Sequence, residues 1–171
     1  GNDLAGTGEL YLEKNAKSVR SLQRAIQIIN ANPACGSPLA CSILMMPPKL
    51  WKTTDPPFVY EKFNCGLELS DLSFKMTSMY GHEHATFSCG DENRLFNLTD
   101  SFVQIRGITV SQGKTVGGGG GISVATTKVR GYNLPNLHML ESQISGCEST
   151  ASGGGLYVEG NDAYVSFTSC N

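Results

Sequence analysis

The chain has 171 residues, a formal net charge of −2 and only 16% charged residues, so its composition gives no basic surface for nucleic acid. No apolar stretch reaches the roughly 20 residues that a membrane-spanning helix needs, and we expect no transmembrane segment. The scarcity of charge and the abundance of Gly, Ser, Thr and Asn suit β-structure with an uncharged polar surface better than a helical bundle.

Residues 1–34 predict a short strand and one helix. Leu10 and Leu12 alternate with polar neighbours, which is typical of a strand. Ser18 is a plausible helix N-cap, and the helix is expected near Val19 to Asn30 because its apolar residues recur every three or four positions. Pro33 ends it, since the residue before a proline avoids helical angles. The apolar face of this helix consists of Val19, Leu22, Ile26 and Ile29.

Residues 35–171 predict many short strands within the same single domain. Cys35 to Cys41 forms a tight loop, Ser42 to Met46 a buried strand, and Lys52 to Pro57 a turn-rich loop. From Val59 onward, short apolar stretches alternate with turns and no second helix intervenes, which indicates an all-β fold.

Two glycine runs lead into two similar strands. Gly117 to Gly121 precedes Ile122-Ser123-Val124, and further along the chain Gly153 to Gly155 precedes Leu156-Tyr157-Val158 in the same way. Repetition at an interval of a few tens of residues points to stacked structural repeats. One repeat is expected to contain a lateral loop, either at the glycine run or at Thr126 to Asn136.

A finer repeat, with a shorter period, involves the cysteines. Phe63-Asn64-Cys65-Gly66 recurs as Phe87-Ser88-Cys89-Gly90, and Ile144-Ser145-Gly146-Cys147 recurs at nearly the same interval as Phe167-Thr168-Ser169-Cys170. Such a period would place each residue over its counterpart, at the interstrand spacing of about 4.8 Å. The residues expected to point inward are Val103, Ile105, Ile108, Val110, Ile122, Val124, Ile144, Leu156, Val158 and Phe167.

The order of these motifs resembles a known superfamily over nearly the whole chain. A strand, the helix with Ser21 to Ile26 and another strand are followed by Thr86 to Gly90, Arg94 to Phe96, Val103 to Val110 and Gly-Gly-Gly-Ile. This order is similar to that of the right-handed parallel β-helix superfamily, which includes pectate-lyase-like folds. The closer resemblance is to extracellular adhesin-like and polymorphic-outer-membrane-protein-like members. The resemblance implies a β-helix solenoid with an N-terminal capping helix, and says little about activity because this fold hosts enzymes, adhesins and fibres.

The six cysteines favour disulfides in a secreted protein, since their spacing fits no zinc site. Equivalent positions one coil apart predict Cys65–Cys89 and Cys147–Cys170, and Cys35–Cys41 closes a local loop. Asn97 begins the Asn-Leu-Thr sequon and is expected to face outward, because Phe96 before it faces inward. We expect an N-glycan at Asn97 if the source is eukaryotic.

Candidate sites for cofactors, metals or catalysis are weak. Gly113-Lys114-Thr115 lacks the glycine spacing and the helix of a phosphate-binding loop. His82 and His84 have no third metal ligand nearby. The acidic pairs Asp91-Glu92 and Glu159 with Asp162 match none of the blocks of polygalacturonase-like enzymes. Arg94, Arg106 and Arg130 are scattered, without the acidic calcium ligands of a pectate lyase. We therefore expect no cofactor, no metal and no catalytic residue.

Three functions remain open. The first is an extracellular structural or adhesin-like glycoprotein module, a subunit of a surface layer or filament. The second is a pectin-active polysaccharide lyase or hydrolase. The third is a non-catalytic glycan-binding module, for which Trp51, Tyr132, Tyr157 and Tyr164 would supply a stacking face. The missing catalytic blocks favour the first and third.

The two ends of the chain carry a further expectation. The chain begins without Met, which suggests processing or trimming, and it ends at Asn171 just after a strand of a coil. We expect either the ordered part of a longer solenoid or association with another copy, by way of a side or loop contact if the helix blocks direct stacking.

Overall fold

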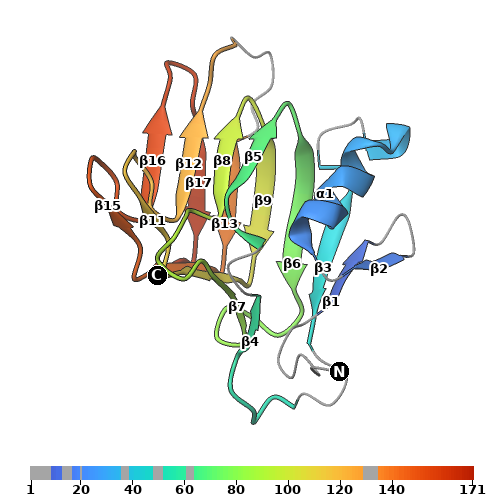
Figure 1. The fold of residues 1–171 in the computed structure, drawn as a ribbon. Helices are drawn as coiled ribbons and strands as arrows, with labels where there is room; N and C mark the ends of the chain where they lie inside the picture. The colour runs from blue at the N-terminus through green and yellow to red at the C-terminus, as the bar shows by residue number, and fades with distance from the viewer. Residues whose placement is uncertain are drawn as a thin grey trace.

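The computed structural model describes residues 9–12, 17–19, 21–35, 39–47, 52–60, 64–128 and 135–171. These residues form short strands and one α-helix, α1, and most of the strand pairs are parallel (Figure 1). The expectation of a mostly β chain is confirmed. None of the sheets closes on itself within the described residues.

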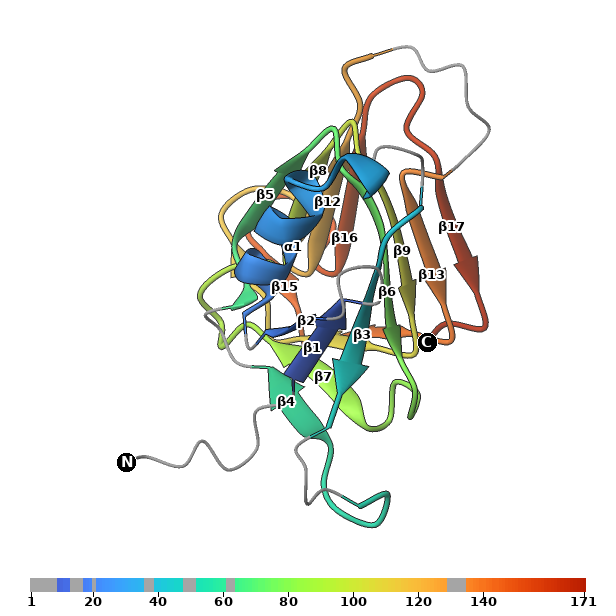
Figure 2. The same cartoon turned by 90° about the vertical axis from the view of Figure 1, so that its right-hand side faces the viewer.

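Three sheets surround the interior of the molecule (Figure 2). The first has seven strands in the order β17-β13-β9-β6-β3-β1-β2, the second β14-β10-β7-β4, and the third β16-β12-β8-β5. The first contains β1 (Glu9–Leu12), β2 (Lys17–Val19), β3 (Ser42–Met46), β6 (Ser73–Ser78), β9 (Phe102–Arg106), β13 (Leu137–Leu140) and β17 (Val165–Thr168). The second contains β4 (Phe58–Tyr60), β7 (Ala85–Ser88), β10 (Thr109–Ser111) and β14 (Gln143–Ser145). The third contains β5 (Leu67–Ser70), β8 (Phe96–Thr99), β12 (Ile122–Ala125) and β16 (Leu156–Glu159).

From β4 onward the chain visits the second, third and first sheets in that order and then repeats the circuit. We call each circuit a coil: β4-β5-β6, then β7-β8-β9, then β10-β12-β13 (the middle coil), and finally β14-β16-β17 (the last coil). Each strand pairs in parallel with its counterpart one coil away, as Thr109 does with both Thr86 and Gln143. Antiparallel pairing occurs where β1 joins β2 and β3.

The glycine repeat marks equivalent positions in the middle and last coils. Ile122 pairs with Leu156 and Val124 with Val158, so the interval inferred from sequence is the register between β12 and β16. The runs themselves lie against each other, since Gly121 N–H donates to Gly155 O at 2.9 Å. Beside them, β11 (Lys114–Thr115) pairs with β15 (Glu148–Ser149) in a small two-stranded sheet. Glycine is required there because a Cβ at Gly120 would collide with the carbonyl oxygens of Glu148 and Gly154.

The interior is apolar, and most of the predicted inward residues line it. Val103, Ile105, Ile108, Val110, Ile122 and Val124 are all buried, and Ile144 and Leu156 are half-buried against the same core. The expected burial is wrong for Val158 and Phe167, which are 41% and 51% exposed although they pair with the buried Val124 and Met139. Both belong to the last coil, whose strands lie at the edges of their sheets, so no described strand covers them.

Helix α1 (Leu22–Asn30) lies across the end of the molecule opposite the last coil (Figure 2). Its residues Leu22, Ala25, Ile26 and Ile29 are buried in the core. The predicted start is wrong, because Lys17–Val19 pairs with β1 as a strand, and a strand cannot also be a helical turn. Ser21, not Ser18, is the N-cap: its Oγ accepts a hydrogen bond from Arg24 N at 3.4 Å.

Two of the three predicted disulfides are present. Cys35–Cys41 has a Cα–Cα distance of 5.3 Å, and Cys65–Cys89, at 5.7 Å, joins neighbouring coils. The third prediction is wrong, because Cys147 and Cys170 are free. Cys147 follows β14, whereas Cys170 follows β17, which pairs with β13. Because the later coils have longer connections, the interval from Cys147 to Cys170 no longer equals one coil.

Candidate binding groove between helix and edge strand

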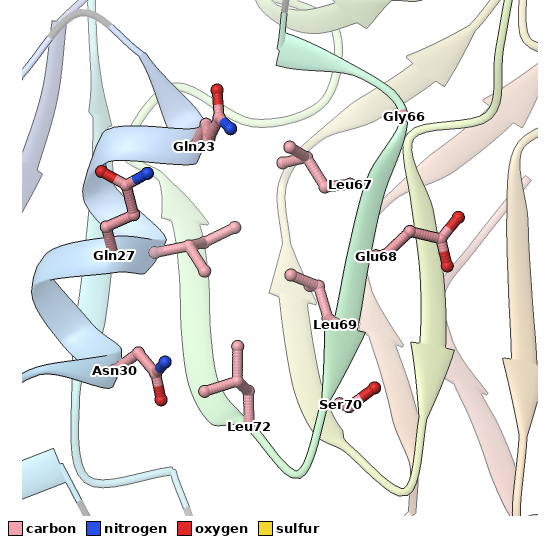
Figure 3. Close-up of a pocket in the computed structure, with 10 residues that line it drawn as sticks. Gln23, Gln27, Asn30, Gly66, Leu67, Glu68, Leu69, Ser70 and Leu72 are labelled. Atoms are coloured by element: carbon pink, nitrogen blue, oxygen red, sulfur yellow. The ribbon is translucent and has the colours of Figure 1, made fainter.

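A groove of about 490 Å³ lies between α1 and β5. Its helix wall carries Gln23, Gln27 and Asn30, and its strand wall is β5 with the flanking Gly66 and Leu72 (Figure 3). Leu67, Leu69 and Leu72 point toward the helix, whereas Glu68 and Ser70 point away from it. The volume is within the range of small-molecule sites.

The polar helix wall follows from the periodicity of α1. Positions 23, 27 and 30 are spaced by four and three residues, so they lie on one flank, beside the buried row that begins with Leu22. All three side chains are exposed. Each primary amide offers two N–H donors and one carbonyl acceptor without carrying a charge. The helix is anchored next to the groove by Leu22 N, which donates to Asn64 Oδ1 at 2.7 Å.

The strand wall is an open sheet edge. β5 pairs with β8 on one side and lies at the end of the third sheet. Leu67 N and Asp71 N donate to Leu95 O and Thr99 O, so the odd-numbered peptide groups of β5 face β8. Alternation along a parallel strand turns the N–H and C=O of Glu68 and Ser70 toward the other, unoccupied side. The groove therefore offers backbone hydrogen-bonding groups as well as amides.

The sequon residue Asn97 lies on the outer face of β8, close to but outside the groove. Its Nδ2 donates to Glu68 Oε2 at 2.6 Å, and this bond keeps the Glu68 carboxylate turned away from the helix. Asn97 is half-buried while Phe96 and Leu98 are buried, so the alternation inferred from sequence holds. Glycosylation at Asn97 stays a prediction.

The other candidate residues are dispersed. His82 Nδ1 lies 3.1 Å from Glu141 O, and among the described residues no three His, Cys, Asp or Glu side chains are placed to share a metal ion. Asp91, Glu92, Glu159 and Asp162 do not line the groove. Trp51, Arg130 and Tyr132 fall outside the described residues.

The arginine and lysine residues near the glycine runs hold structure together. Arg94 Nη1 donates to Gly118 O at 2.5 Å and Nη2 to Thr115 Oγ1 at 2.8 Å, which fastens the first glycine run to the coil before it. Lys114 lies 3.0 Å from Glu148, and this hydrogen bond raises the pKa of the lysine. Tyr157 lies against Gly118, where an added Cβ would meet its ring, so it serves as packing.

The free thiols differ in their surroundings. Cys147 is half-buried and accepts a hydrogen bond from Gly113 N at 3.4 Å, yet burial has the larger effect and raises the pKa of the thiol. A raised pKa lowers the thiolate fraction, which makes a nucleophilic role for Cys147 unfavourable. Cys170 lines a smaller hollow of about 270 Å³ in the last coil, with Met139, Ile144 and Phe167.

Sequence reasoning missed the groove, although one signal was available. The polar flank of the predicted helix carries amides at 23, 27 and 30, but nothing local shows that this flank lies beside the first strand of the third sheet. That juxtaposition depends on β1, β2 and α1 closing the end of the molecule. Comparison of the chain with protein-family models, curated proteins and solved structures finds no match.

Proposed function

We propose that this chain is a right-handed parallel β-helix that serves as a structural or adhesin-like module of an extracellular glycoprotein. The repeated order of the three sheets, the in-register columns and the apolar interior support the solenoid. The two disulfides support an oxidising compartment. No helix in the described part of the chain is both long and apolar enough to cross a bilayer.

One observation carries the structural role: charged side chains are paired between coils. Arg106 Nε lies 3.1 Å from Glu141 Oε2, Lys114 Nζ 3.0 Å from Glu148, and Lys128 Nζ 2.7 Å from Asp71. These pairs are exposed, so each adds little stability. Their arrangement favours a structural role over a catalytic one. A catalytic site needs several charged groups directed at one cavity, whereas these three pairs are distributed along the stack.

A corner of the stack shows the same use of charge. Asp100 is buried, and its carboxylate accepts hydrogen bonds from Thr127 N at 3.0 Å and from Lys128 N at 3.3 Å. It thereby ties the segment after β12 to the corner after β8. Asp71, at the corner after β5 in the coil before that of Asp100, accepts a hydrogen bond from the Lys128 ammonium. Carboxylates that elsewhere could act as acid or base are used here as ties between coils.

The proposal is tested on native material. Electron microscopy is expected to show filaments or a layer, and intact mass is expected to show a glycan at Asn97 in a eukaryotic source. Light scattering on the 171-residue chain is expected to show association that rises with concentration. A soluble monomer without filaments over a wide concentration range would contradict the assembly role. Release of oligosaccharides from pectin-like polymers would favour an enzyme, and an experimental structure would decide the handedness of the coils.

A further inference from the structure

We propose that the groove between α1 and β5 binds an extended peptide that adds to the third sheet as an extra strand beside β5. The partner is a segment with apolar side chains at alternate positions and no charge in the part that enters the groove. Strand addition of this kind takes its affinity from main-chain hydrogen bonds and its specificity from alternate side chains. This interaction goes beyond the structural role proposed above.

The cover at the edge of β5 is α1, and the groove leaves room between the helix and the strand. The strand itself carries few of the other devices by which proteins block an open edge. It contains no Lys or Pro, and its four residues pair with β8 without a bulge. The edge strand β4 differs, because Pro56 and Pro57, which have no N–H, immediately precede Phe58. The one charge on β5, Glu68, is engaged by Asn97 on the outer face.

The side chains around this edge define the partner. A strand beside β5 continues its alternation, so every second side chain would extend the inward column of Leu67 and Leu69. Leu72 and Ile26 also line the groove, which makes that side apolar. The polar residues of the helix wall are uncharged amides, so a basic side chain entering the groove would lose water without gaining a counter-ion. An acidic side chain would have to compete with Gln27 Oε1 for the Arg24 guanidinium, which donates to it at 3.3 Å.

The same end of the molecule already shows strand addition. β1 pairs antiparallel with β3 over Glu9–Leu12 and extends the first sheet past the last parallel strand. A peptide on β5 would extend the third sheet at the same end, on the other side of α1 (Figure 2). The proposed pairing would thus repeat, on the third sheet, an addition that the first sheet already contains.

The test uses the full chain and a capped synthetic peptide of residues 121–126, which is uncharged and alternates Ile122 and Val124 with polar or small residues. Hydrogen exchange followed by NMR is expected to show slower exchange at Glu68 and Ser70 when the peptide is added. The amides that already face β8, such as Leu67, are expected to change little. Unchanged exchange at Glu68 and Ser70 at saturating peptide would overturn the proposal.

Two peptide variants separate strand pairing from apolar attraction. One is N-methylated at Ile122 and Val124, the other at Ser123 and Ala125. Only one set of N–H groups can face β5, so one variant is expected to bind about tenfold more weakly or worse, and the other like the parent. Equal binding of the two variants would overturn the proposal.

Two tryptophan variants locate the site. Gln27→Trp fills the groove and is expected to weaken peptide binding by about tenfold. Val116→Trp adds the same ring at an 84%-exposed position that does not line the groove, and is expected to leave binding unchanged. Hydrogen exchange without peptide at several protein concentrations, with sedimentation to report association, completes the test. If protection of Glu68 and Ser70 rises with protein concentration alone, a second copy occupies the groove and the peptide proposal is overturned.

Discussion

The middle and last coils have matching sequences but differ in burial. Val124 in β12 is fully buried, whereas Val158, its register partner in β16, is 41% exposed. Met139 in β13 is 1% exposed, whereas Phe167 opposite it in β17 is 51% exposed. The direction of a side chain follows from alternation along its own strand. Its burial also requires a neighbouring coil on each side, and local sequence carries no information about that neighbour.

The largest effect is expected where coils are joined covalently. Replacing Cys65 and Cys89 together by Ala removes a disulfide with a sequence separation of 24 residues. In the chain-entropy model this lowers the free energy of unfolding by about 3.5 kcal/mol, measured by urea denaturation. Cys170→Ala in the last coil removes only a free thiol and is expected to change the free energy of unfolding by about 1 kcal/mol or less. Similar losses for both variants would mean that the disulfide does not stabilise the early coils.

The glycine runs offer a matched pair between the same two coils. Gly120→Ala in the middle coil forces a Cβ against the carbonyl oxygens of Glu148 and Gly154, and we expect a loss of about 3 kcal/mol. Gly154→Ala in the last coil meets only Cys147 O, at 3.1 Å, and is expected to lose about 1 kcal/mol or less. Thermal unfolding of the two variants checks the order. A larger loss for Gly154→Ala would contradict the stacking of the runs.

Val124 and Val158 test the comparison of the middle and last coils directly, because they are register partners of the same residue type. Val124→Ala is expected to lower the free energy of unfolding by about 2 kcal/mol, through lost burial and a cavity. Val158→Ala is expected to lower it by about 0.5 kcal/mol, because much of that side chain is already in water. Urea denaturation measures both. Equal losses would indicate that Val158 is covered in solution, for example by another copy.

The smallest effect concerns the Cys147 thiol. Burial raises its pKa, so at about pH 8 it is less ionised than a thiol in unfolded chain, and alkylation by iodoacetamide should be slower in the folded protein. Mass spectrometry of the labelled peptide, with and without urea, measures the rates. Equal rates would show that the corner after β14 opens readily.

Local patterns predicted the features that depend on neighbours along the chain. The repeated glycine runs predicted the strand at Ile122 to Ala125 and its alignment with Leu156. Glycine is needed there because the two runs pack backbone against backbone. The disulfide between Cys65 and Cys89 was predictable because their sequence separation of 24 residues brings them to neighbouring coils. The inward direction of Val110 and Ile105 follows from alternation.

Features that depend on distant neighbours were not predictable in this way. Val19 fits the helical period, but pairing with β1 assigns it to a strand. Cys147 and Cys170 have the right spacing, but the longer connections of the later coils place them at different corners. The groove arises where α1 and β5 meet, although the two elements are far apart in the sequence, and no pattern within either element encodes that contact.

The coils differ in length while their strands keep the same partners. The register partners Thr86 and Thr109 lie closer together in the sequence than the register partners Thr109 and Gln143 do. The difference lies in connections such as that between Ala125 and Leu137. A gene encoding such a chain can therefore gain or lose whole segments at the corners without changing one strand partner. Deleting a single codon within β12 would instead exchange the inward and outward sides of the strand. Variation among related sequences is thus expected to concentrate in corner length, with strand length held constant.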